Sequence, residues 1–281
     1  MSAEICGVPF PFGARIASDE LDERLKAVDE SIAWLKDQKK FDIDDGQKLW
    51  YVYLNGLWKT DLWQNQHALA RKLSNILLEI PDFQCEIYIS SFFTGVGKEW
   101  SHLDKWRIEK FLVLVRAFVE TIFEWAKKNN KIETYIPQLC TDVLSLQNCI
   151  GLQLQFIDVI ADPLSALMKK DTKIGGEYLK PFSSIFAKSH SQAALVIRIN
   201  DKLIEPLMKS DGESLFGNDI DAILKFMRGF ISLLNSSLKQ QESSPRVAQI
   251  RYDTAAQVRQ LIADILTAKE QAGAPPEKTT D

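Results

Sequence analysis

Apolar residues recur at steps of three and four along most of the chain, which is the spacing of one face of an α-helix. Between residues 18 and 38 these positions are Leu21, Leu25, Val28, Ile32 and Leu35. They predict a first helix over 18–38, with Ser18 near its N-cap. The same spacing predicts further helices over 45–60, 61–80, 101–128, 131–147, 150–169, 176–189, 191–209, 219–239 and 245–272.

One segment breaks the uniform pattern. DFQCEIYISSFFT, which follows Pro81, is short and rich in β-branched and aromatic residues. Propensity alone favours a strand there. We predict a helix instead, because the neighbouring segments on both sides have the helical spacing.

Long helices joined by short loops favour an all-α fold of irregular stacked antiparallel helix pairs. The pairs recur about every 40 residues, as in HEAT and armadillo arrays, although the sequence shows no clean internal repeat. We therefore predict a single HEAT/armadillo-like helical domain over 18–272, with an N-terminal extension over 1–17 and a disordered tail over 273–281, whose sequence is GAPPEKTTD. A compact helical bundle is the structural alternative.

Composition and charge limit the classes of protein to which this chain can belong. The chain is 46% hydrophobic and 26% charged, which is ordinary for a protein with a real core. No run of about 18 apolar residues is free of charge, so we expect no membrane span, and the N-terminus lacks the pattern of a secretory signal. The four cysteines are scattered, which suits a reducing compartment. The net charge of −4 does not suggest autonomous nucleic-acid binding.

Two acidic clusters are the candidates for a metal site. The first holds Asp42, Asp44 and Asp45, and the second holds Asp219 and Asp221. Neither has the spacing of a calcium-binding loop, and each precedes a predicted helix, where carboxylates cap free N–H groups. We interpret both as caps and expect no metal and no cofactor. A metal-dependent enzyme is the less favoured alternative.

Other catalytic patterns are weak. Gly95-Val96-Gly97 lacks the third glycine and the preceding strand of a dinucleotide-binding loop, so we predict an ordinary loop there. His67, His102 and His190 are far apart and form no metal or triad spacing. We therefore expect no catalytic residues and no small-molecule substrate.

The segment KEWSHLDKWRIEKF, residues 98–111, combines high charge with two tryptophans. We predict that Ser101 and Asp104 form a variant capping box at the start of the 101–128 helix. On that helix Asp104 and Arg107 fall on the same face as Phe111, so we expect a partly buried i,i+3 ion pair at the edge of the core. Two independent solvated charges are the alternative.

The opposite face of this helix carries Trp106, Val113 and Ala117. Lys105, Lys110 and Arg116 flank this apolar stripe. A tryptophan beside basic residues is typical of contacts with a protein or RNA, so Lys105, Trp106, Lys110 and Arg116 are the candidate contact residues. The alternative, which we favour, is that the helix is sandwiched inside the fold and Trp106 lies in the core.

Four blocks of this sequence resemble, in order, the ribosomal RNA processing protein 1 family. The first, KLWYVYLNGLWKTDLWQNQHALARKL at 48–73, has the family's two aromatic pairs followed by an Asp and a Gln, but Leu62-Trp63 stands where the family usually has Lys-Pro. The second is EWSHLDKWRIEKFLVLVRAFV at 99–119. The others are YLKPFSSIFAKSHSQAALVIRINDKLIEPLM at 178–208 and IRYDTAAQVRQLI at 250–262.

This resemblance implies a non-catalytic protein of the nucleus and nucleolus that supports rRNA processing in precursors of the large ribosomal subunit. Its implied partners are other large-subunit assembly factors, ribosomal proteins and, within the particle, pre-rRNA. A helical-repeat adaptor in transport or trafficking is the alternative function.

Overall fold

The structure is a computed structural model that describes residues 4–170, 175–187, 192–206, 220–238 and 244–273. Its helices pack in antiparallel pairs, so the predicted all-α class is confirmed; the HEAT- or armadillo-like repeat type stays a prediction. Backbone packing divides the chain into two compact units, residues 1–159 and 160–281, which are described separately. The division falls inside helix α8 (Ile150–Lys170).

The first unit begins with a small hairpin, β1 (Glu4–Ile5) and β2 (Val8–Pro9), whose turn residues Cys6 and Gly7 both have positive φ. The helices that follow are α1 (Gly13–Ile16), α2 (Leu21–Lys36), α3 (Ile43–Trp58), α4 (Trp63–Asn75), η1 (Ile76–Leu78), α5 (Asp82–Trp100), α6 (Ile108–Lys128), α7 (Ile132–Ser145) and the first part of α8. Ile5, Phe10 and Ile16 are buried, so the predicted N-terminal extension packs on the helices.

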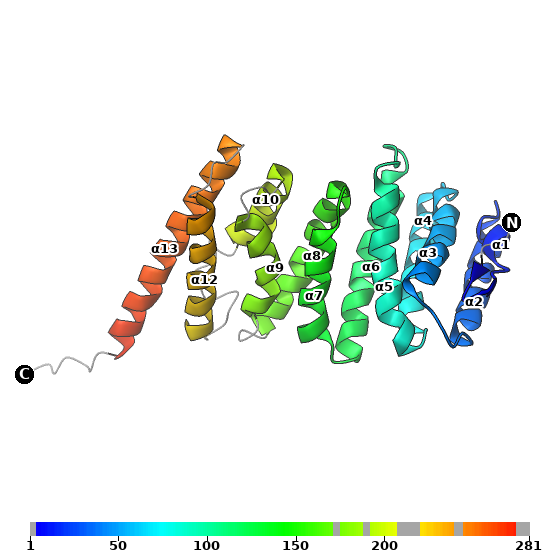
Figure 1. Cartoon of the computed structure of the whole chain (residues 1–281), viewed down its shortest axis with the longest axis horizontal. Helices are drawn as coiled ribbons and strands as arrows, with labels where there is room; N and C mark the ends of the chain where they lie inside the picture. Colours follow the sequence, from blue (N-terminus) through cyan, green and yellow to red (C-terminus); the bar gives the residue numbers. More distant parts are fainter. Residues whose placement is uncertain (1–3, 171–174, 188–191, 207–219, 239–243, 274–281) are drawn as a thin grey trace, which may run out of the picture. The chain divides into compact units, whose positions relative to one another are not determined.

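Helices α3 to α6 form two layers in the first unit. Helix α3 packs mainly against α5, and α4 packs mainly against α6 (Figure 1). Gly46 allows the close approach of α3 and α5, because a Cβ atom there would lie 2.2 Å from the Ser91 hydroxyl oxygen. The segment after Pro81 is part of α5, which confirms the predicted helix; burial against α3 outweighs its strand propensity.

An aromatic cluster around Trp50 forms the core between these layers. The Trp50 ring is fully buried and contacts Tyr53, Tyr88, Phe92 and Phe118, with ring centroids 4.6–5.8 Å away. Its indole N–H donates to the carbonyl oxygen of Tyr88 at 2.9 Å. The apolar surface of this tryptophan is therefore packed in the core, and its one hydrogen-bond donor has an acceptor.

The helix predicted over 101–128 begins seven residues later than expected. Helix α5 continues to Trp100, residues 101–107 form a turn, and α6 begins at Ile108. The Asp104 carboxylate accepts the backbone N–H groups of Trp106 and Arg107 at 2.9 and 3.0 Å. These bonds hold a turn before α6 and replace the predicted capping box with Ser101. Gly95-Val96-Gly97 lies inside α5, so the loop predicted there is wrong.

The second unit contains the rest of α8, α9 (Gly175–Ala187), α10 (Ala193–Ile199), a π-helical turn η2 (Asn200–Ile204), α12 (Ile220–Leu238) and α13 (Pro245–Gly273). Helix α12 packs against α9 and α13. Buried Phe182, Phe186 and Phe230 lie in its core, and the guanidinium of the buried Arg251 donates to the Phe186 carbonyl oxygen at 2.8 Å. Apart from Gly273, the predicted tail lies outside the described residues.

Helix α8 is long and apolar enough, over Ile150–Leu167, to cross a membrane by length and composition. Its sequence also contains Asp158 and Asp162. Phe156, Ile157 and Ile160 on this helix are fully buried in the protein. This combination is typical of the core helix of a folded protein.

Candidate partner-binding surface

The α3–α4 and α5–α6 connections lie at the same end of the first unit, and Lys110 joins them. Its ammonium donates to the carbonyl oxygens of Trp58 at 2.9 Å and Thr60 at 2.6 Å, and lies 3.6 Å from the Asp61 carboxylate. The Lys110 residue is only 3% exposed. Burial lowers the pKa of Lys110, although the Asp61 carboxylate opposes this change.

Lys110 was a candidate contact residue, and its position corrects that interpretation. The predicted α6 face placed it beside the apolar stripe, at the surface. The structure instead turns the ammonium inward to cap the carbonyl groups at the end of α3. We therefore assign Lys110 to holding the two connections together.

Asp104 and Arg107 form an ion pair in the turn that precedes α6. Each side chain is 42% exposed and both residues are partly buried, as predicted, although the pair lies in a turn and not on the helix. Burial alone would raise the pKa of Asp104. The carboxylate also accepts two backbone N–H groups and lies beside the Arg107 guanidinium, and these interactions together hold its pKa below the usual value. The Arg107 guanidinium also covers the Trp58 ring, 4.3 Å from its centroid, and so ties the turn to α3.

Trp106 is 77% exposed, so the favoured prediction that it lies in the core is wrong. That prediction projected Trp106 onto a helix that begins only at Ile108. The Lys105 ammonium lies 4.7 Å from the centroid of the Trp106 ring. The turn therefore presents an aromatic ring and a cation to solvent together.

Two further exposed apolar residues lie at this end, and the helical spacing of the sequence did not indicate them. Leu62 and Trp63, at the start of α4, are each 65% exposed. In the family that the sequence resembles, Lys-Pro usually stands at these two positions. This difference was the feature of the sequence that could have indicated an unusual surface here. We call Leu62, Trp63, Lys105 and Trp106 the loop-end surface. Their two connections are joined by Lys110, so large exposed apolar side chains lie at one end of the unit, as at interaction sites.

A groove with a volume of about 330 Å³ lies over α6, on the α4 and α8 side of the first unit. We call it the α6 groove; its lining residues are His67, Arg71, Leu112, Val113, Arg116, Ala117, Glu120 and Gln155. Val113 and Ala117, the rest of the predicted stripe, are half-buried in it, and the candidate residue Arg116 is exposed at its side. The Trp63 ring packs on His67, with centroids 4.5 Å apart, which connects the groove to the loop-end surface.

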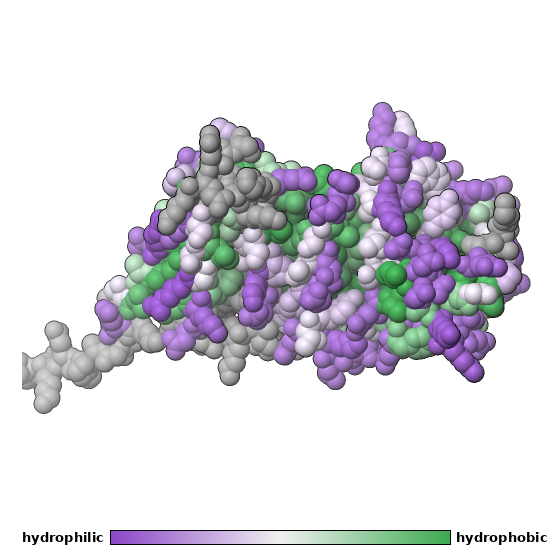
Figure 2. All heavy atoms as spheres, viewed as in Figure 1, coloured by the Kyte–Doolittle hydropathy of each residue, from purple (hydrophilic) through white to green (hydrophobic). Residues whose placement is uncertain are grey.

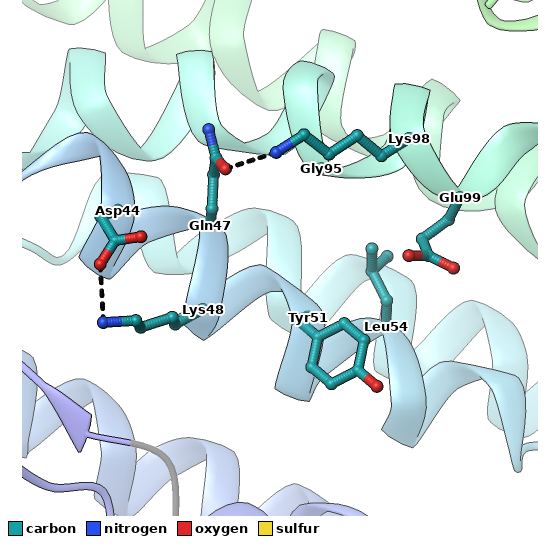
Figure 3. A pocket seen from close by; sticks show the side chains of 8 residues that line it. All are labelled: Asp44, Gln47, Lys48, Tyr51, Leu54, Gly95, Lys98 and Glu99. Atoms are coloured by element: carbon teal, nitrogen blue, oxygen red, sulfur yellow. Dashed lines mark hydrogen bonds and ion pairs between the residues drawn. The ribbon is translucent and has the colours of Figure 1, made fainter.

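A second pocket, of about 260 Å³, lies between α3 and α5 (Figure 3). Asp44 pairs with Lys48 at 2.6 Å, and the Lys98 ammonium donates to the side-chain oxygen of Gln47 at 2.8 Å. In the space-filling view, a compact hydrophobic patch on this face of the first unit is bordered by hydrophilic side chains (Figure 2). The lysines of this pocket already have partners within it, which distinguishes it from the α6 groove.

The first acidic cluster forms a helix cap, as predicted. The Asp42 carboxylate accepts the Asp45 N–H at 3.0 Å, and the Asp45 carboxylate accepts the N–H groups of Asp42 at 3.3 Å and Cys6 at 2.6 Å. Asp219 and His190 lie outside the described residues. Within the part of the chain that the structure describes, no three His, Cys, Asp or Glu residues group as metal ligands.

Comparison with known proteins identifies the family. The family model for the nucleolar protein Nop52 matches residues 8–247. The chain is 25% identical over 199 residues to ribosomal RNA processing protein 1 homolog B of Homo sapiens, which covers 63% of this chain and 25% of the relative. It is 22% identical over 223 residues to the Caenorhabditis elegans homolog, covering 76% of this chain and 56% of the relative.

The homolog of Drosophila melanogaster is 24% identical over 206 residues, covering 69% of this chain and 30% of the relative. The match thus extends over between a quarter and just over half of the length of these relatives. The family match, in contrast, covers most of this chain and includes the loop-end surface and the α6 groove. The chain therefore belongs to the Nop52 family of nucleolar proteins.

Proposed function

We propose that the protein is a non-catalytic helical scaffold in the biogenesis of the large ribosomal subunit, where it supports pre-rRNA processing in nucleolar precursors. The observation that carries this proposal is the Nop52 match over residues 8–247. The relatives named for ribosomal RNA processing support the same role. Nop52 is not a known enzyme family, and the proposal assigns the chain no catalytic residue and no cofactor.

The proposed partners are other large-subunit assembly factors and ribosomal proteins, with pre-rRNA contacted inside the particle. The loop-end surface is the proposed docking site, because Trp63 and Trp106 expose large rings and Lys105 lies beside the Trp106 ring. Tryptophan is enriched among the residues that dominate protein interfaces. A net charge of −4 favours attachment through protein neighbours, since binding to free RNA depends on cations that contact phosphates.

Affinity purification of the tagged protein from nucleoli tests this function. We expect sequencing of the bound RNA to show enrichment of large-subunit precursor rRNA over small-subunit precursors, with large-subunit assembly factors among the bound proteins. Enrichment of vesicle coats or nuclear transport receptors without precursor rRNA would instead favour the adaptor alternative.

A pair of variants tests the proposed docking site within the same experiment. Trp63→Ser/Trp106→Ser should reduce the recovered precursor rRNA without lowering the melting temperature, because both rings are largely exposed. Tyr252→Ser is the matched control, since Tyr252 is an aromatic residue of the second unit that is 56% exposed. Equal recovery with both variants would contradict docking through the loop-end surface.

A further inference from the structure

We propose that the α6 groove binds an acidic segment of a partner protein that inserts an aliphatic side chain into it. This inference rests on the proposed scaffold function and names the chemistry of one partner. Three observations carry it: the apolar floor of the groove, the two arginines beside it, and its continuity with the loop-end surface.

The floor of the groove is aliphatic. Leu112, Val113 and Ala117 of α6 line it, and all three are only half-buried. The Gln155 side chain of α8 donates to the Leu112 carbonyl oxygen at 3.4 Å, which links α8 to this part of α6. From Val113 to Glu120 the groove extends along roughly 10 Å of helix, at about 1.5 Å per residue. This length fits one or two apolar side chains of a short segment.

The charge beside the groove is net positive, with two arginines and the one carboxylate of Glu120 among its lining residues, although the chain as a whole is acidic. Arg71 of α4 and Arg116 of α6 are exposed and form no ion pair within 4.0 Å with any residue that the structure describes. Other cations of the same unit, such as Arg15 and Lys131, have carboxylate partners. Guanidinium groups bind carboxylates through paired hydrogen bonds, so the two free arginines match an occupant that carries Asp or Glu.

The floor favours a protein segment over RNA. Single-stranded RNA is held by stacking of its bases on exposed aromatic or guanidinium planes. Apart from the two guanidinium groups beside it, the groove offers an aliphatic floor, and the ring in its lining, that of His67, already packs on Trp63. An amphipathic segment placed in an apolar groove uses such a floor directly.

Fluorescence anisotropy with the whole purified chain tests the inference. The probe is a labelled synthetic 14-residue helix of glutamates, with leucine at every third or fourth position. Two control peptides replace its glutamates with lysines or its leucines with serines. We expect the acidic leucine peptide to bind, and both controls to bind about ten-fold more weakly or worse, since buried contacts between opposite charges and apolar anchors govern affinity.

Two variants test separately how the arginines and the apolar floor contribute to peptide binding. Arg71→Glu/Arg116→Glu and, independently, Ala117→Trp, which fills the groove, should each weaken the binding of the peptide about ten-fold. The matched control is Lys127→Glu/Lys128→Glu, which makes the same charge change on exposed residues at the far end of α6. It should leave affinity within about two-fold. Circular dichroism and thermal melts establish that each variant is folded.

Three outcomes would overturn the inference: no binding of the acidic peptide, an equal loss in the control variant, or unchanged binding by Ala117→Trp. Binding of a twelve-nucleotide uridine RNA that depends on the two arginines, with no peptide binding, would also overturn it and assign the groove to RNA. The proposed function fails separately, if the tagged wild-type protein does not recover large-subunit precursor rRNA.

Discussion

The ammonium of Lys110 donates to the carbonyl oxygen of Thr60 at 2.6 Å, although fifty residues separate the two in the sequence. A second bond, to the Trp58 carbonyl oxygen, occupies the end of α3. The first turn of α6 therefore fixes the connection that carries Leu62 and Trp63. Arg107, which covers the Trp58 ring, fixes the neighbouring turn that carries Trp106.

Lys110→Met should lower the free energy of unfolding by about 1–3 kcal/mol, because the buried carbonyl group of Thr60 and the partly buried one of Trp58 would lose their donor. Urea unfolding at pH 7 measures this loss. Lys105→Met makes the same chemical change on an exposed neighbour and should have little effect. A Lys110→Met protein that is more stable than wild type would mean that burial of the charge costs more than its hydrogen bonds contribute.

Trp106→Ala and Trp50→Ala should separate binding from stability. The Trp50 ring is fully buried, so its removal should cost about 3–5 kcal/mol. Trp106 is 77% exposed, so its removal should change stability by no more than about 0.5 kcal/mol, while recovery of precursor rRNA falls. Thermal melts and affinity purification of both variants provide the comparison. A marked loss of stability in Trp106→Ala would mean that the ring contributes to the core.

The sequence predicted the helices well where long apolar patterns were bounded by clear signals. Pro81 separates α4 and η1 from α5, and Asp42 caps α3 as its position indicated. The helical spacing of the neighbouring segments also predicted correctly that the strand-like composition after Pro81 forms a helix.

The candidate site was predicted less well, because its geometry depends on a turn and on distant contacts. The apolar spacing continues through residues 98–111 without a break. It therefore does not show that α5 ends there and that the Asp104 carboxylate holds a turn before α6. Trp106 was therefore projected onto a helix that does not include it. The role of Lys110 could not be predicted from the residues around it, because its two acceptors, the carbonyl groups of Trp58 and Thr60, lie about fifty residues earlier in the chain.

Asp42→Ala should destabilise the protein by about 0.5–2 kcal/mol, because the N–H of Asp45 would lose its cap at the start of α3. Asp44→Ala is the control: Asp44 pairs with Lys48 on the exposed side of the same helix, so its loss should cost less than about 0.5 kcal/mol. Unfolding in urea measures both. Since we interpret the cluster as a cap, Mg²⁺ and Ca²⁺ should leave the unfolding midpoint unchanged. Stoichiometric binding of either ion in a calorimetric titration would contradict this interpretation.

Cys6 should react slowly with iodoacetamide at neutral pH in the folded protein, although it is not fully buried. Burial and the carboxylates of Asp45 and Asp42 raise the pKa of the Cys6 thiol to about 11. Because the thiolate is the reactive form, the alkylation rate should rise about ten-fold per pH unit from pH 7 to 10, beyond the pH at which a free thiol of pKa about 8.5 levels off. Mass spectrometry of the Cys6 peptide after timed labelling measures the rate, and the same peptide in guanidinium-unfolded protein is the control. A plateau near pH 9 in the folded protein would show that neither burial nor the two carboxylates raise the pKa of this thiol.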